Sequence, residues 1–244
     1  TQSDGKGTDY EAGDEFTIGS NVTLYAVWQE NLKYTVMYNG NGSTSGTPPT
    51  DTGGNAPSGN TYYTGSTVTV LGKGDLVKEN WTFIGWNTSS DGKGDTYVEN
   101  DTFIIESDVT LYAVWQENSK YTVTYNGNGN TSGTAPTDTN GNAPSGNTYY
   151  IGSTVTVLGP GVLVKENWTF VNWNTQADGK GDTYAAGDTF TIESNVTLFA
   201  VWQENPKYTV TYNGNGNTSG TPPSDTGGNA PSGNTYYIGS TVNV

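Results

Sequence analysis

Short segments in which apolar and polar residues alternate recur along the chain and predict β-strands. Residues 34–38 and 67–70 follow this pattern, which places Tyr34, Val36 and Tyr38 on one face of the first strand. Residues 102–105 and 109–115 form two further predicted strands. The row of residues 109–115 expected to face the core comprises Val109, Leu111, Ala113 and Trp115. No segment carries apolar residues at helical spacing over three turns, so the fold class is expected to be mainly β.

Residues 81–86 form another predicted strand with a less regular pattern. Strict alternation places Phe83 on one side of the strand and Ile84 with Trp86 on the other. Apolar residues on both sides predict a strand that is covered on both faces.

A long polar tract, residues 42–60, separates the first two predicted strands and consists mainly of Gly, Ser, Thr, Pro and Asn. Such a composition does not bury enough apolar surface to fold by itself. Two interpretations stay open: a flexible loop that wraps around the domain, or an ordered flap held by Tyr62 and Tyr63.

The chain is built from repeats with a period of 87 residues. Residues 34–120 and 121–207 are identical at 69 of 87 positions, so the two copies are expected to share one fold. Residues 1–33 correspond to the C-terminal part of a repeat, and residues 208–244 correspond to the N-terminal part. The predicted domains are therefore 1–33, 34–120, 121–207 and 208–244.

A period of this length indicates independent small domains instead of a solenoid. Four residues, 116–119, separate the last predicted strand of one copy from the next copy, which predicts a restricted angle between neighbours and an elongated rod. For the partial copies we favour a window on a longer array. The alternative is that the partial copies complement neighbouring chains in a filament.

Composition excludes most enzyme mechanisms. The chain has no Cys and no His, and all nine of its basic residues are Lys, so no thiolate, imidazole or Arg clamp is present. The net charge of −15 opposes binding to nucleic acid or anionic lipid. No apolar run reaches the ~18 residues of a membrane helix, so membrane insertion is not expected. No cofactor is predicted.

The segments YTVTYNGNG, GSTVTVLG, ENWTFVNWNTQADGKGDTYAAGDTFTI and NVTLFAVW occur in this order. This order resembles the Listeria-Bacteroides repeat, or internalin B-repeat, of bacterial surface proteins. The resemblance implies tandem β-grasp-like domains on secreted or wall-attached proteins, with spacer, stalk or adhesin roles and no catalysis. It also implies that the first and last strands lie side by side. Asn80 and Asn167 stand where the family usually has Gly.

The turn from Asp91 to Asp95 and its copy from Asp178 to Asp182 carry acidic residues at a spacing similar to that of calcium loops. Lys93 in the middle of the turn favours a plain hairpin turn. These four Asp residues are the metal candidates.

Trp81 and Trp168 are the candidate ligand residues, because an exposed indole ring can stack on a sugar. Rings at strand periodicity more often belong to the core.

Two further chemistries have the required residue types. Lys78, Glu79 and Asn80 could support an isopeptide crosslink, although neighbours on one strand point to opposite faces and a solvated charge cluster is favoured. Glu99 and Asp101 could act in glycoside hydrolysis, but the second copy has Ala186 in place of Glu99.

The sequence thus predicts a non-catalytic, extracellular structural repeat array on the bacterial surface, either a stalk or spacer or an adhesin rod. Its expected partners are neighbouring repeats, with a cell-surface glycan or protein receptor as a further possibility. The alternatives are a self-assembling filament completed by strand addition, and a module that binds a glycan or host surface.

Overall fold

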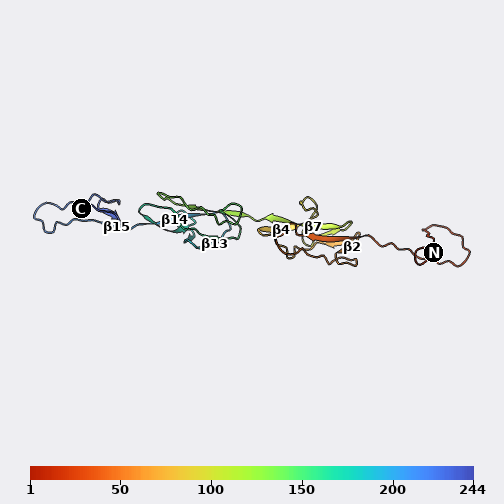
Figure 1. Ribbon diagram of the computed structural model, residues 1–244. Coiled ribbons are helices and arrows are strands. Elements are labelled where there is room, and N and C mark those ends of the chain that lie inside the picture. The colour runs from red at the N-terminus through yellow and green to blue at the C-terminus, as the bar shows by residue number, and fades with distance from the viewer. The chain divides into compact units, whose positions relative to one another are not determined.

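The computed structural model describes residues 1–244, and its regular secondary structure consists of strands without a helix (Figure 1). This confirms the mainly β fold class. The strands of the first half are β1 (Lys33–Asn39), β2 (Thr61–Tyr63), β3 (Thr67–Thr69), β4 (Trp81–Asn87), β5 (Thr96–Tyr97), β6 (Thr102–Ile104) and β7 (Val109–Glu117). Those of the second half are β8 (Lys120–Asn126), β9 (Thr148–Tyr150), β10 (Thr154–Thr156), β11 (Trp168–Asn174), β12 (Thr183–Tyr184), β13 (Thr189–Thr191), β14 (Val196–Glu204), β15 (Lys207–Thr209) and β16 (Thr235–Tyr237).

The chain forms two compact units, Thr1–Glu117 and Asn118–Val244. The first unit contains a five-stranded sheet in the order β2-β1-β7-β4-β5 and a small sheet of β3 and β6. The second unit contains the equivalent sheet β12-β11-β14-β8-β9, the pair β10-β13, and the pair β15-β16 from the third copy. The two complete copies of the repeat therefore share one strand topology, as their sequence identity predicts.

The first and last strands of each complete repeat are parallel neighbours. Val36 of β1 is opposite Val109 of β7, and the pairing continues to Asn39 and Tyr112. In the second repeat β8 and β14 pair in the same way from Val123 and Val196. All other strand pairs are antiparallel. This mixed sheet agrees with the adjacency of first and last strands that the family resemblance implies.

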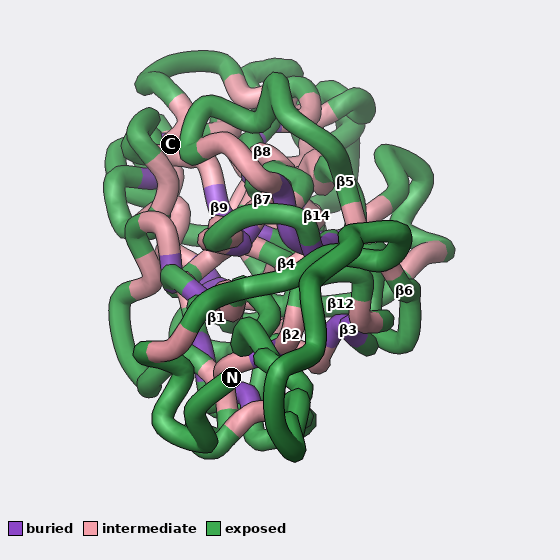
Figure 2. Tube along the Cα trace, turned by 90° about the vertical axis from the view of Figure 1, so that its right-hand side faces the viewer, coloured by how far each residue is buried: buried purple, intermediate pink, exposed green.

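The core of each repeat lies between the five-stranded sheet and the segment that contains β3. From the sheet, Val36, Leu111 and Trp86 are at most 1% exposed, and Val68 and Leu76 cover them from the other side. The predicted core rows of β1 and β7 are confirmed: Leu111 and Ala113 are buried, and Val109 and Trp115 pack against them. Figure 2 shows that the buried positions lie mainly on strands, whereas most connecting segments are exposed.

The prediction that Phe83 and Trp86 lie on opposite sides of their strand is wrong. The register of β4 against β7 shifts between Phe83 and Gly85, so Ile84 is an extra residue that is 49% exposed. A β-bulge of this kind changes which residues face the core. The rings of Phe83 and Trp86 therefore contact each other on the core side, with centroids 5.1 Å apart. The first part of the strand is therefore covered on one face, with Thr82 and Ile84 exposed, whereas Gly85, Trp86 and Asn87 at its end are all buried, as coverage on both faces predicts.

The partial copies contain less regular structure. Residues 1–32 form no strand, and Trp28 is 90% exposed although its equivalent, Trp115, packs against a core. In the third copy β15 pairs with β16, but residues 210–234 form no strand. The division of the chain at residues 33, 120 and 207 stays a prediction.

Candidate functional site

The acidic turn after β4 is organised by one buried asparagine. The Asn87 side chain is 1% exposed, and its Oδ1 accepts hydrogen bonds from the backbone N–H groups of Ser89 at 2.8 Å and Gly94 at 2.9 Å. Its Nδ2 donates to the Gly94 carbonyl at 2.9 Å and to the Thr96 hydroxyl at 3.0 Å. Asn174 makes the equivalent bonds in the second repeat. Sequence reasoning missed Asn87, although its recurrence after Trp in both copies was a usable signal.

The metal candidates lie on this turn. Asp91 accepts hydrogen bonds from the Ser89 hydroxyl at 2.7 Å and from the Lys93 backbone, and its other oxygen pairs with the Lys93 ammonium at 3.0 Å. The Ser89 hydroxyl and then Lys93 lower the pKa of Asp91. Asp178 pairs with Lys180 in the same way.

The remaining metal candidates, Asp95 and Asp182, use their backbone N–H groups to contact Thr88 and Thr175. No group of three or more acidic side chains in the chain is arranged to hold a metal ion. The calcium assignment therefore stays a prediction, and the geometry of the turn is that of a hairpin with internal hydrogen bonds.

The ligand candidates Trp81 and Trp168 lie at the start of β4 and β11 and are partly buried. The ammonium of Lys78 lies 4.2 Å from the Trp81 ring centroid, and that of Lys165 lies 4.5 Å from Trp168. These are cation–π distances. Trp81 also lines a cavity of about 430 Å³.

The residues considered for an isopeptide crosslink and for glycoside hydrolysis are not arranged for these reactions. Lys78 lies at the surface over Trp81, and Asn80 sits in a left-handed turn with φ of 62°, so neither forms a buried pair. The Asp101 carboxylate accepts a hydrogen bond from the Val98 backbone N–H at 2.7 Å, which closes the turn between β5 and β6. Asp101 thus has a structural role beside Glu99.

The polar tract of residues 42–60 is held to the domain by specific contacts. Asp51 is 3% exposed, and its two carboxylate oxygens both accept from the Tyr62 hydroxyl at 2.9 Å. The Asn55 side chain accepts from the backbone N–H of Tyr63 at 3.0 Å. The same Asp–Tyr pair recurs as Asp138 and Tyr149. These contacts favour the ordered flap over the flexible loop.

The joint between the second repeat and the third copy is short and hydrogen-bonded. β14 ends at Glu204 and β15 begins at Lys207, so two residues separate them. The predicted joint of four residues, 116–119, is likewise two residues long, because β7 continues to Glu117 and β8 begins at Lys120. One Glu204 carboxylate oxygen accepts from the Lys207 ammonium at 2.7 Å and from the Tyr237 hydroxyl at 2.8 Å. Lys207 and then Tyr237 lower the pKa of Glu204. Asn205 is fixed by Thr169, whose hydroxyl donates to it at 2.7 Å.

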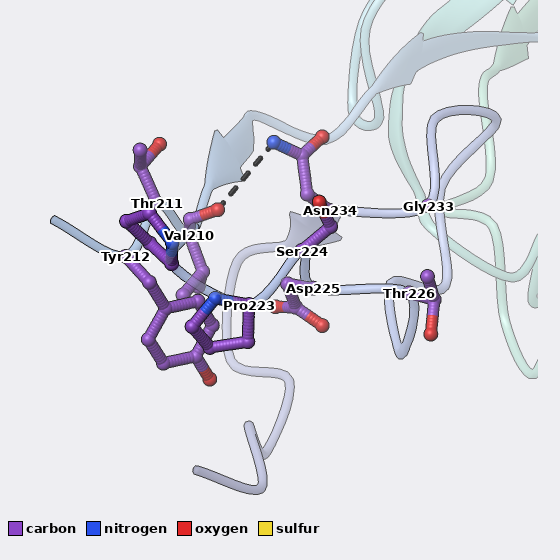
Figure 3. Close-up of a pocket in the computed structure, with 10 residues that line it drawn as sticks. Val210, Thr211, Tyr212, Pro223, Ser224, Asp225, Thr226, Gly233 and Asn234 are labelled. Atoms are coloured by element: carbon purple, nitrogen blue, oxygen red, sulfur yellow. Dashed lines mark hydrogen bonds between the residues drawn. The ribbon is translucent and has the colours of Figure 1, made fainter. Parts of the chain in front are cut away.

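A cavity of about 600 Å³ lies in the third copy beside Val210, Tyr212 and Asp225 (Figure 3). The Asn234 side chain donates a long hydrogen bond of 3.4 Å to the Val210 carbonyl at its rim. In the complete repeats the residues equivalent to Val210 and Tyr212 are core residues, for example Val36 and Tyr38. This cavity is therefore lined in part by residues whose equivalents pack in the core of the complete repeats, beside polar residues such as Asp225 and Asn234.

The recurrence of one mixed sheet at an interval of 87 residues defines a tandem array of β-domains. In both complete repeats the side-chain contacts described above organise the fold at the bulge, the acidic turn and the polar tract. The chain belongs to the Listeria-Bacteroides repeat domain family, whose family model matches residues 1–27, 34–114 and 121–201. This confirms the resemblance drawn from the sequence.

Two relatives come from Evansella cellulosilytica. One, named "Putative Gly-rich membrane protein", is 39% identical over 169 residues, which is 67% of this chain and 18% of the relative. The other, named "Putative membrane protein", is 34% identical over 190 residues, which is 78% of this chain and 25% of the relative. The chain thus spans a quarter or less of the length of these relatives. No helix of the chain has the length and apolar character that crossing a membrane requires.

Among solved structures, Streptococcal High Identity Repeats in Tandem domains 3-4 from a cell surface protein are 14% identical. The alignment covers 71% of this chain and 98% of that chain, with a TM-score of 0.26. A score this low carries no argument about fold or function.

Proposed function

We propose that the chain is part of an extracellular repeat array on the bacterial surface, where it acts as a non-catalytic stalk or spacer that can present an adhesive segment. The observation that carries the proposal is the parallel pairing of the first and last strands of each repeat. Membership of a family of repeat domains supports the structural role.

Parallel pairing makes each repeat extend the chain along the strand direction. Val36 and Val109 are level with each other, Lys33 lies three residues before that level, and Glu117 lies eight residues beyond it. At ~3.3 Å per residue these positions are about 36 Å apart along the strands. A repeat therefore adds length to a stalk at each copy.

The same pairing decides how a repeat responds to tension. A force applied at Lys33 and Glu117 acts along β1 and β7 in opposite directions. The hydrogen bonds between these strands are then loaded together, in shear, and must break at once instead of one after another. We expect this geometry to resist pulling on a surface-attached chain.

Short joints between repeats support the stalk. Glu204, Lys207 and Tyr237 connect the end of one repeat to the strands of the next copy. Glu117, Lys120 and Tyr150 occupy the equivalent sequence positions one period earlier. Two-residue joints have far less conformational freedom than Gly/Ser linkers.

Single-molecule pulling tests the proposal, and the absence of native Cys allows handles at any chosen site. With handles on Leu32→Cys and Asn118→Cys, force acts in shear on β1 and β7. With handles on Glu79→Cys and Asn118→Cys, force unzips the antiparallel pair β4 and β7. We expect a clearly higher unfolding force for the first pair, with a contour-length gain on the order of 30 nm for one repeat.

An unfolding force for the Leu32/Asn118 pair that is equal to or below that of the Glu79/Asn118 pair would contradict the mechanical role. Electron microscopy of the purified chain separates the stalk from the filament alternative. Isolated particles support the stalk, whereas unbranched fibres that lengthen with concentration support strand addition between chains.

A further inference from the structure

One cavity of the first repeat combines an apolar wall with charged groups. Its volume is about 430 Å³, within the usual range of small-ligand sites. Three aromatic side chains contribute to the wall, Trp81, Phe83 and Trp115. The rim carries Lys73, Lys78 and Glu99.

The aromatic wall is held rigid by contacts behind it. Phe83 lies edge-on to Trp115, with centroids 5.6 Å apart, and edge-on to the fully buried Trp86 at 5.1 Å. The indole N–H of Trp115 donates to the Gly40 carbonyl at 2.9 Å. The indole N–H of Trp81, in contrast, makes no hydrogen bond within the chain. A donor thus remains available beside the apolar wall.

The three rim charges do not neutralise one another. No ion pair joins Glu99 to Lys73 or Lys78. The Lys73 ammonium donates to the carbonyl oxygens of Gly74 and Leu76, which leaves one of its three N–H groups, and the Lys78 ammonium lies over the Trp81 ring. The cavity therefore offers ammonium donors, an indole donor and a carboxylate acceptor around a flat apolar surface.

The second repeat supplies a natural comparison. Every residue that lines this cavity has an identical equivalent in the second repeat except the two charged residues Lys73 and Glu99, which become Pro160 and Ala186. The difference between repeats is thus confined to polar groups that a ligand could contact, whereas the aromatic wall is retained.

We propose that this cavity is a binding site for a saccharide unit that carries a carboxylate, of the uronic acid class. The apolar face of a pyranose matches the aromatic wall, its hydroxyl groups can donate to Glu99, and its carboxylate can accept from Lys73 and Lys78. A neutral apolar ligand uses none of the rim charges. The −15 net charge of the chain repels anions in general, so selectivity depends on these two ammonium groups.

NMR titration of the full chain tests the site, with methyl β-D-glucuronide as the acidic probe and methyl β-D-glucoside as its neutral control. For a single sugar unit we expect binding in the millimolar range. The Trp81 indole N–H signal is expected to shift saturably with the glucuronide. The dissociation constant from this shift should be at least about fivefold lower for the glucuronide than for the glucoside. The Trp168 indole signal is the internal control and should not follow the same curve.

Variants in which the two rim residues of one repeat are replaced by their equivalents from the other repeat test the site further. Each substituted residue already occurs at that position in the other copy. Lys73→Pro with Glu99→Ala should weaken glucuronide binding at least about fivefold, and Pro160→Lys with Ala186→Glu should make the Trp168 signal respond. Unchanged far-ultraviolet circular dichroism verifies folding of both variants. Absence of a saturable shift, equal responses of Trp81 and Trp168 in the unmodified chain, or equal binding of the glucoside would each overturn the proposal. None of these outcomes affects the pulling experiment, which tests the stalk separately.

Discussion

At the scale of single residues, asparagine occupies several left-handed turn positions that commonly require glycine. Asn80 and Asn167 have φ angles of 62° and 64°, and Asn100, at 72°, is replaced in the second repeat by Gly187 at 91°. Asparagine tolerates this region better than other residues with a Cβ. This explains physically why Asn80 and Asn167 can stand where the family usually has Gly.

We expect Asn167→Val to destabilise the second repeat by about 1–2 kcal/mol, because a β-branched residue is strained at positive φ. Asn167→Gly should change stability by only a few tenths of a kcal/mol. Urea unfolding of both variants measures the difference. Equal stability of the Val and Gly variants would show that the turn does not hold the left-handed conformation.

Asp108 gives a pH-dependent prediction with a natural control. Its carboxylate accepts from the backbone N–H and the hydroxyl of Thr35 at 2.7 and 2.9 Å, and these bonds lower its pKa below 3.8. In the second repeat Asn195 accepts the same bonds from Thr122.

A carboxylate with a lowered folded-state pKa stabilises the fold at pH values above its ordinary pKa, and this contribution is lost as the pH falls through the lowered value. Asp108→Asn should therefore be slightly less stable than the unmodified chain at neutral pH, and the gap should close as the solution is acidified through and below 3.8. Thermal unfolding over a pH series measures the gap. A gap that stays constant on acidification contradicts the assignment.

At the scale of elements, the hydrophobic pattern predicted β1, β3, β4, β6 and β7 and the core rows of β1 and β7, but not the short strands β2 and β5 or the bulge. Val36 and Leu111 follow strict alternation, so their faces could be read directly. Ile84 breaks the alternation as an inserted residue, and Gly85 in the first repeat was the sole local hint, absent in the second repeat where Asn172 stands. An insertion of one residue depends on the partner strand, which a single segment does not reveal.

Contacts of the polar tract were unpredictable for a related reason. Composition left residues 42–60 open between a flexible loop and an ordered flap, whereas in the structure the buried Asp51 carboxylate holds this tract to Tyr62. The sequence did show that Tyr62 was a possible anchor, but not which acid it contacts. The same limit applies to the cavity near Trp81. The sequence contains the aromatic and charged residues of this cavity, but it does not show that they line one cavity together.

Tyr62→Phe tests the flap. Burial and the bond to Asp51 raise the Tyr62 pKa, and removal of its hydroxyl leaves the buried Asp51 carboxylate with the Gly53 backbone N–H at 2.7 Å as its remaining hydrogen-bond donor. We expect a loss of about 1–3 kcal/mol in unfolding free energy and faster hydrogen exchange in residues 51–60.

Tyr63→Phe is the matched control, because the Tyr63 hydroxyl makes no hydrogen bond in the structure. It should change unfolding free energy by much less than Tyr62→Phe. Similar losses in the two variants would show that ring packing, and not the buried hydrogen bond, holds the flap.

At the scale of the whole molecule, the chain has 24 acidic and 9 basic residues and a net charge of −15. Repulsion among the acidic side chains destabilises the folded state. Raising the ionic strength from about 0.01 M to about 0.15 M shortens the Debye length from ~30 to ~8 Å. The unfolding temperature should therefore rise with added NaCl, as scanning calorimetry can measure. A fall would mean that surface ion pairs such as Lys207–Glu204 outweigh the repulsion.

The parallel arrangement of β1 and β7 also bears on how such a gene changes over generations. The chain enters each repeat at one end of the sheet and leaves it at the other end. A whole 87-residue copy can therefore be inserted or deleted without changing the direction in which the chain enters the neighbouring repeats. A change in copy number would thus leave every individual fold unaltered.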